Sequence, residues 1–222
     1  MRSVMYRDIY EIPELRILGQ TLESEDRVLE IGGGVGFVST YVARKCGDAN
    51  ITVVEANPDL IPLIEENHRL NGVGPRIINA AATPDDRATE TFHVAENFWS
   101  SSTTATGTRK INVPAINTNS LLAECDPTYL IVDIEGAESE IIPTLNLRNV
   151  RKLLIELHPQ FSSMTAANDV ILQLYRKGFV IDLNLSIRYQ LFMVPSDDHA
   201  IMRQSIDNWP IPESRAGAAP VA

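Results

Sequence analysis

Five short runs of Val, Ile and Leu constrain the fold of this chain more than any other feature. They cover residues 27–31, 51–55, 76–79, 129–134 and 152–157. Apolar runs of this length with little polar alternation are typical of parallel strands buried on both faces of a sheet. Helix-like segments separate them at residues 36–46, 58–71, 137–143 and 164–177. The alternation predicts an α/β fold, with a mostly parallel sheet covered by helices on both faces.

The rest of the chain completes this sheet or lies outside it. Residues 89–117 predict two short strands, TETFHVA and KINVPAI, around a Ser/Thr-rich stretch. Residues 179–184 and 189–194 predict a hairpin around Ser186-Ile187-Arg188. With 222 residues, 44% of them hydrophobic, the chain suits one domain. We expect that domain to span residues 1–222, with its core at about 11–195, an N-terminal lid-like segment at 1–20 and a mobile C-terminal tail at 207–222.

The stretch VLEIGGGVG, residues 28–36, places four glycines between the first predicted strand and the first long helix. It fits the pattern acidic-x-Gly-x-Gly-x-Gly with Glu30, Gly32, Gly34 and Gly36. Open α/β sheets bind ligands outside the carboxyl ends of their strands, and glycines there let the ligand approach the main chain. A tight turn with no ligand is the plainer interpretation of this motif alone.

A second acidic residue favours a nucleoside ligand. Glu55 ends the second predicted strand, 19 residues after Gly36, where a carboxylate can accept two hydrogen bonds from a ribose diol. A dinucleotide site prefers Gly-x-Gly-x-x-Gly, but the third glycine position here holds Ser39 or Phe37, depending on the register. This disfavours a nicotinamide dehydrogenase. S-adenosylmethionine carries an ammonium group that Glu30 could face, so the pattern indicates that cofactor.

Charge and composition limit the classes of partner that this chain can bind. The net charge of −10 argues against nucleic acid and against an anionic membrane surface as partners. No stretch approaches the roughly 18 consecutive apolar residues of a membrane helix. Two cysteines far apart, Cys46 and Cys125, and a charged N-terminus without an apolar signal core predict a cytoplasmic protein with reduced thiols.

Four segments in this order, LEIGGGVGFVS, VEANP, IVDIEGAE and LLIELHP, carry a family resemblance. From about residue 11 to 195 the chain resembles the class I S-adenosylmethionine-dependent methyltransferases, and specifically the FkbM-type family. The resemblance implies a Rossmann-like sheet of seven mostly parallel strands with an antiparallel last strand. It implies methyl transfer, typically to a hydroxyl of a sugar, polyketide or related natural product. The cofactor positions that it implies are Glu30, Gly32, Gly34, Gly36, Glu55, Asn57, Ala81 beside the adenine and Asp133 near the methionine end.

Oxygen methylation requires a base, and the ends of two strands offer candidates. Asp133 and Glu135 follow the fourth apolar run, and Glu156 and His158 end the fifth. Residues two apart point the same way on an extended backbone. His158 is our first choice as general base, because an imidazole titrates near neutrality, with Asp133 and Glu135 as catalytic partners.

Each of these residues also has a structural interpretation. His158 could fix the turn before Pro159, and Glu135 could cap the helix that starts near Gly136. We expect Glu138 to be a charge in the first turn of that helix rather than a catalyst. The strand-end carboxylates and histidine could hold Mg²⁺, but their spacing does not demand it, and we expect no required metal.

Several positions leave alternatives open. The family commonly has a lysine where this chain has Ile131, and commonly reads TLD at Thr118-Asn119-Ser120. Two alternatives to methylation of a small hydroxylated molecule therefore remain open. The chain could methylate a nitrogen or a protein, or it could be a catalytically inactive cofactor-binding protein. Further candidates are a stacking or anchoring role for Trp99 beside Ser100–Ser102, lid residues Tyr6, Tyr10 and Glu11, and surface or packing roles for His68, His93 and His199.

Overall fold

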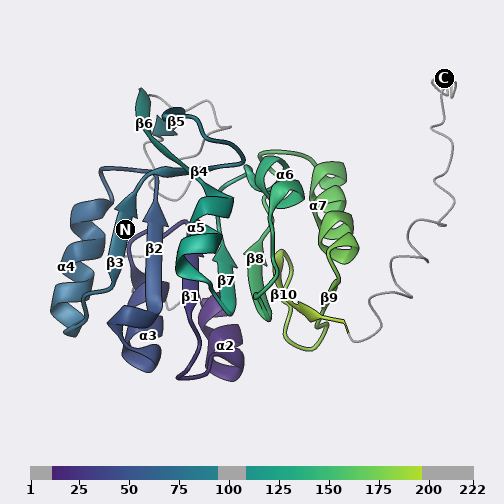
Figure 1. Ribbon diagram of the computed structural model, residues 1–222, viewed down its shortest axis with the longest axis horizontal. Coiled ribbons are helices and arrows are strands. Elements are labelled where there is room, and N and C mark those ends of the chain that lie inside the picture. Colours follow the sequence, from purple (N-terminus) through teal and green to yellow (C-terminus); the bar gives the residue numbers. More distant parts are fainter. Residues whose placement is uncertain (1–11, 95–108, 197–222) are drawn as a thin grey trace, which may run out of the picture.

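The computed structural model describes residues 12–94 and 109–196, which form a seven-stranded sheet with helices on both faces and a small second sheet (Figure 1). The strand order in the large sheet is β3-β2-β1-β7-β8-β10-β9. Its strands are β1 (Val28–Ile31), β2 (Ile51–Glu55), β3 (Arg76–Asn79), β7 (Tyr129–Val132), β8 (Lys152–Glu156), β9 (Phe179–Ile181) and β10 (Gln190–Pro195). The helices are α2 (Ile12–Thr21), α3 (Phe37–Cys46), α4 (Ile61–Asn71), α5 (Thr118–Cys125), α6 (Glu138–Ile141) and α7 (Met164–Arg176), with 3₁₀ turns η1 (Asp48–Asn50) and η3 (Ile142–Thr144).

The large sheet is parallel except at one edge. β1 pairs in parallel with β2 on one side and with β7 on the other, whereas β10 runs antiparallel to both β8 and β9. The predicted seven-stranded, mostly parallel sheet with an antiparallel last strand is therefore confirmed. The chain leaves β1 toward β2 and returns to its other side at β7, so the order of strands reverses at β1. In open α/β sheets this reversal opens a crevice at the carboxyl ends of the strands, where ligands bind.

Two apolar clusters sandwich the sheet. Successive residues of β1 point to opposite faces, so Leu29 packs on the side of α5 and α7, and Val28 packs on the side of α2 and α3. Ile17 of α2 is fully buried in the second cluster. Part of the expected N-terminal segment, residues 12–20, thus belongs to a helix that packs against the sheet.

A small sheet stands beyond the carboxyl ends of the large one (Figure 1). β5 (Thr89–Val94) and β6 (Arg109–Asn117) pair antiparallel, and β4 (Ala81–Thr83) pairs in parallel with β6. The two strands predicted within residues 89–117 are confirmed. The sequence analysis missed β4, whose three small residues carry little strand signal.

The helix boundaries differ from expectation where side chains rearrange the first turn. The helix expected from residue 58 begins at Ile61, because the side chain of Asn57 accepts the backbone N–H of Asp59 and forms a separate turn. The helix expected at 137–143 is shorter, and it passes into the 3₁₀ turn that contains Pro143. None of the described helices combines the length and the apolar character that a membrane span requires.

Candidate active site

The glycine turn brings the backbone of β1 against the end of β7. Gly32 adopts a positive φ of 97°, and its N–H donates to the carbonyl of Val54 at 2.9 Å. A Cβ atom at Gly32 would lie 1.7 Å from the carbonyl oxygen of Asp133. Only glycine fits there, which explains why the motif has a glycine at this position. The turn continues through Gly36, which has a φ of 78° and starts α3 without a side-chain cap.

Glu55 ties the end of β2 to the glycine turn. One carboxylate oxygen accepts the N–H of Gly34 at 2.9 Å, and the other accepts the N–H of Asn57 at 2.6 Å. The side chain is buried, and this burial raises the pKa of Glu55 to about 7 against the lowering effect of its backbone hydrogen bonds. Each oxygen retains a second lone pair. The carboxylate therefore has acceptor capacity left at the end of β2, where the sequence analysis expects it to contact a ribose diol.

The other predicted cofactor positions surround this turn. Glu30 is buried within β1, where it pairs in register with Ile131 of β7. Asn57 is also buried, and its side chain shapes the turn before α4. Ala81 begins β4, and it packs with Phe92 and Val113.

Asp133, Glu135 and His158 come together at the carboxyl ends of β7 and β8. One possible ligand atom of each residue lies within 4.8 Å of the others. Nε2 of His158 is 3.4 Å from Oδ1 of Asp133 and 3.5 Å from Oε2 of Glu135. Oε1 of Glu156 lies 3.8 Å from the same nitrogen. The structure thus gathers all four residues that the strand-end argument selected.

Glu138 makes a contact that the sequence analysis did not predict. It lies in the first turn of α6, as expected, but it is 2% exposed and contacts His158 directly. Its Oε1 is 2.5 Å from Nδ1 of His158 and also accepts the N–H of Gly136 at 3.2 Å. An ionised carboxylate only accepts, so Nδ1 carries the proton and Nε2 faces the cluster. The acidic pattern of DIEGAESE was the only signal for this residue, and its partner lies 20 residues away.

Burial and the charges of neighbouring residues shift the pKa values of the residues in this cluster. The pKa of Glu135 is raised to about 7, first by burial and then by neighbouring carboxylates, against the opposing effect of His158. The pKa of Glu156 is raised to about 8, chiefly by burial and by the charge of Asp133. Burial alone would lower the pKa of His158, but the hydrogen bond with Glu138 and the surrounding carboxylates raise it to about 9.

Helix α2 contributes a residue that the sequence analysis did not select. Glu14 is 8% exposed, and its Oε2 is buried without a hydrogen-bond partner among the described residues. It lies near enough to Glu156 for its charge to help raise the pKa of that residue. Glu14 sits on a helix that looks purely amphipathic, so no local motif marked it.

The other residues that the sequence analysis singled out either have packing contacts or lie outside the described residues. His68 is buried and its Nε2 lies 2.8 Å from Oγ of Ser39, which fits the expected packing role. His93 is half-buried on β5. Ile131, where the family commonly has lysine, is buried in the apolar cluster beneath α2 and α3. The positions that lie outside the described residues are Tyr6, Tyr10, Glu11, Trp99, Ser100–Ser102 and His199.

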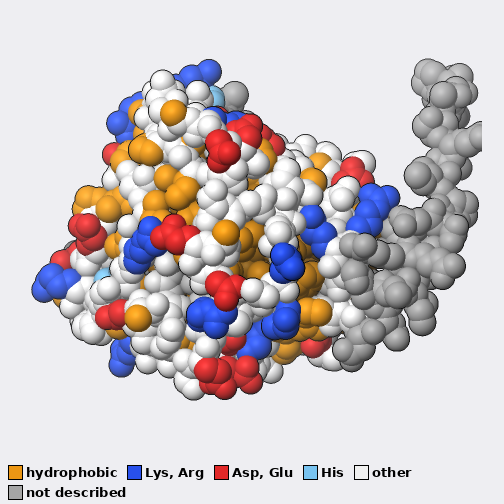
Figure 2. Space-filling view, in the orientation of Figure 1, with side chains coloured by type: hydrophobic (Ala, Val, Ile, Leu, Met, Phe, Trp, Pro, Cys, Tyr) orange, Lys and Arg blue, Asp and Glu red, His pale blue; other side chains and the backbone are white. Residues whose placement is uncertain are grey.

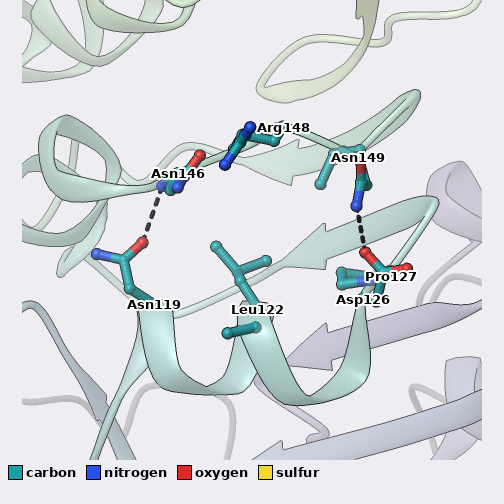
Figure 3. A pocket seen from close by; sticks show the side chains of 9 residues that line it. Asn119, Leu122, Asp126, Pro127, Asn146, Arg148 and Asn149 are labelled. Atoms are coloured by element: carbon teal, nitrogen blue, oxygen red, sulfur yellow. Dashed lines mark hydrogen bonds between the residues drawn. The ribbon is translucent and has the colours of Figure 1, made fainter.

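A cavity of about 510 Å³ lies away from this cluster, between α5 and the segment before β8 (Figure 3). Asn119 points toward Asn146, and its amide oxygen accepts that backbone N–H at 2.8 Å. Asn149 reaches the carboxylate of Asp126 at the other end of the helix. Neither the strand-end carboxylates nor the glycine turn lines this cavity. Asn119, which departs from the common family residue, therefore holds a loop.

Solved structures with low sequence identity share the fold of this chain. A solved precorrin-6y C5,15-methyltransferase from Geobacter metallireducens GS-15 matches with 12% identity and a TM-score of 0.50, over 83% of this chain and 86% of that chain. A ribosomal protein L11 methylase from Lactobacillus delbrueckii subsp. bulgaricus matches with 16% identity and a TM-score of 0.48, over 83% and 76%. No match was found among the curated proteins.

The sheet order and the solved neighbour show the Rossmann-like fold, and the family model over residues 30–181 shows that the chain is an S-adenosylmethionine-dependent methyltransferase of class I. The family model described as the methyltransferase FkbM domain matches residues 30–181, well over half of the chain. The chain belongs to the FkbM methyltransferase family, and its cofactor is S-adenosylmethionine. The residues present suit that cofactor, because Glu55 keeps acceptor capacity beside the glycine turn and Glu30 supplies a carboxylate on the next strand.

Proposed function

We propose that this enzyme methylates a hydroxyl oxygen of a small molecule such as a sugar, a polyketide or a related natural product. The observation that carries the proposal is the cluster of Asp133, Glu135 and His158 beside the glycine turn. A hydroxyl is a weak nucleophile until its proton leaves, so an oxygen acceptor needs polar groups next to the reacting atoms. This cluster is suited to that task.

Residues of β1, β2 and the glycine turn would hold the cofactor. Glu55 would accept hydrogen bonds from the ribose hydroxyls, and Glu30 would face the ammonium group. Gly32, Gly34 and Gly36 keep the main chain open to close approach, Asn57 shapes the neighbouring turn, and Ala81 would lie beside the adenine. When bound, S-adenosylmethionine supplies an electrophilic methyl group on a sulfonium.

The cluster at β7 and β8 would receive the acceptor. In the transfer, the acceptor O–H bond breaks and a new O–C bond forms as the methyl–sulfur bond breaks, and S-adenosylhomocysteine leaves. His158, with a pKa of about 9 rather than near neutrality, is already protonated at neutral pH, so Glu135, whose pKa is about 7, would take up the released proton. Asp133 and His158 would orient the acceptor oxygen in line with the methyl carbon. Glu138 fixes the ring of His158 for this role through its contact with Nδ1.

Surface charge favours a small acceptor over nucleic acid. On the face shown in Figure 2, Lys and Arg side chains alternate with Asp and Glu and form no broad basic surface. The net charge of −10 points the same way.

The test is a product assay with methyl-labelled S-adenosylmethionine and a panel of hydroxylated and amine-bearing small molecules. We expect S-adenosylhomocysteine release together with an O-methylated product. We expect Glu135→Gln to lower kcat with little change in cofactor affinity, and Glu140→Gln, an exposed carboxylate on α6, to behave as wild type. Methylation only at nitrogen or on protein, or cofactor binding without turnover on any acceptor, would overturn the proposal in favour of the two alternatives.

A further inference from the structure

We propose that Asp133, Glu135 and His158 form a binding site for one divalent transition-metal cation, with Glu156 beside it. The site itself rests on donor geometry, whereas its use in catalysis rests on the proposed function. It departs from the expectation, based on spacing alone, that no metal is required. The first reason is that three strand-end donors converge on one point.

The distances fit a shared ion. First-row cations bind oxygen and imidazole nitrogen at about 2.0–2.2 Å, so neighbouring ligand atoms lie about 3 Å apart and opposite ones about 4.3 Å apart. Nε2 of His158 lies 3.4 Å from Asp133 and 3.5 Å from Glu135, between these two values. Both separations exceed a good hydrogen bond, and they leave room for an ion between the atoms.

The histidine is oriented as metal-binding histidines commonly are. A ligating imidazole usually donates its other ring N–H to a carboxylate, which fixes the tautomer and the ring plane. Here the buried Glu138 lies 2.5 Å from Nδ1, so Nε2 faces the cluster, and a cation that displaces the proton of Nε2 would bind its lone pair.

The backbone at Glu135 supports a functional role for its side chain. Glu135 has a φ of 50°, a left-handed conformation that is uncommon for a residue other than glycine, asparagine or aspartate. Gly136 follows it with a φ of 103°. Strain of this kind persists where the surroundings hold a residue in place, often at functional sites. The strained turn puts the Glu135 carboxylate within 3.5 Å of His158.

A buried carboxylate on another part of the chain also favours a cation near this cluster. Glu14 comes from α2, on a different part of the chain, and its buried Oε2 has no hydrogen-bond partner among the described residues. A buried carboxylate oxygen left this way is costly unless a positive group joins it. Glu14 lies near enough to Glu156 for its charge to act on that residue. One imidazole already faces four carboxylates there, those of Asp133, Glu135, Glu138 and Glu156.

The donor set favours a transition metal. Carboxylates suit Mg²⁺, Ca²⁺ and Mn²⁺, while imidazole suits Zn²⁺, Fe²⁺ and similar ions. A mixed set of one imidazole and two or three carboxylates suits an ion that accepts both, such as Mn²⁺. The charge of such an ion beside the acceptor would favour loss of a hydroxyl proton.

The test is Mn²⁺ binding to the full chain after treatment with a chelator and dialysis, without cofactor or acceptor. Electron paramagnetic resonance of free Mn²⁺ and calorimetry give affinity and stoichiometry. We expect one saturable site per chain. We expect Asp133→Asn and Glu135→Gln each to weaken binding at least tenfold, while the control Glu140→Gln leaves it unchanged. Thermal unfolding shows whether each variant is folded.

A spectroscopic measurement keeps the proposal testable if one variant unfolds. Electron spin echo modulation of bound Mn²⁺ should show coupling to an imidazole nitrogen, and His158→Gln should remove that coupling. The absence of saturable Mn²⁺ binding to wild type, as expected if the cluster receives a cationic substrate instead, would overturn the metal site. Unchanged binding in folded Asp133→Asn and Glu135→Gln would also overturn it. S-adenosylmethionine binding in the presence of chelator, measured in parallel, tests the proposed function separately.

Discussion

Replacing Gly32 by alanine tests the contact that joins the glycine turn to the catalytic strand. The added Cβ would lie 1.7 Å from the carbonyl oxygen and 2.7 Å from the carbonyl carbon of Asp133. Ordinary contacts between such atoms are about 3.5 Å, so the two backbones must separate by almost 2 Å. That movement breaks the hydrogen bond from Gly32 N to Val54 and the one from Asp133 N to Ile31.

The expected magnitude follows from these losses. A left-handed alanine costs about 1–2 kcal/mol, and two backbone hydrogen bonds contribute about 1 kcal/mol each. With residual strain, Gly32→Ala should lower the free energy of unfolding by about 4 kcal/mol or more, and Tm by roughly 8–16 °C for a chain of this size. S-adenosylmethionine binding should also weaken, because the turn moves.

Gly72→Ala is the matched control. Gly72 has a φ of 68°, also in the left-handed region, but nothing lies within 4 Å of its Cβ position. Gly72→Ala should lower the free energy of unfolding only by the cost of a left-handed alanine, about 1 kcal/mol. The assay is urea unfolding followed by circular dichroism, with thermal melts as a second measure. If Gly32→Ala is as stable as Gly72→Ala within about 1 kcal/mol, the close approach to Asp133 is refuted.

Three further predictions concern the cofactor and the loop beside α5. Glu55→Ala should weaken S-adenosylmethionine binding about 100-fold, or about 2.7 kcal/mol, by calorimetry, while Glu66→Ala on the exposed face of α4 should change it less than twofold. Because burial raises the pKa of Glu55 to about 7, cofactor affinity should fall about tenfold as the pH drops from 8 to 6 and the carboxylate protonates, and Glu55→Gln should flatten this profile. Affinity that stays constant with pH in wild type would contradict that role. Asn119→Ala should lose the bonds to Thr144 and Asn146 and destabilise the fold by about 1–2 kcal/mol in urea, with cofactor affinity unchanged. A large loss of affinity in this variant would place Asn119 in the cofactor site.

Local chemistry explains which parts of the fold the sequence could predict. The five parallel strands were found to within one or two residues. The four inner ones, β1, β2, β7 and β8, are largely buried, and a strand buried on both faces must be apolar throughout. The start of α4 was wrong by three residues because the Asn57 side chain forms its own turn before the helix. β4 went unnoticed because three small residues acquire strand structure only by pairing with β6.

The same local chemistry decides which residues of the candidate site the sequence could identify. Glu55 and the glycines were identifiable because their roles depend on position within one strand–turn–helix unit. Glu138 and Glu14 were not, because their roles depend on partners distant in sequence, His158 and Glu156. The spacing of two between Asp133 and Glu135 predicted that they share a side, but it could not show the left-handed backbone at Glu135.

The most direct test of the central account is calorimetric titration of the wild-type chain with S-adenosylmethionine, repeated with S-adenosylhomocysteine and with NADH. The account predicts one site of micromolar affinity for S-adenosylmethionine, competition by S-adenosylhomocysteine and no binding of NADH. Failure to bind either adenosyl compound, or binding of NADH at the same site, would contradict the assignment of Glu30, Glu55 and the glycine turn to this cofactor.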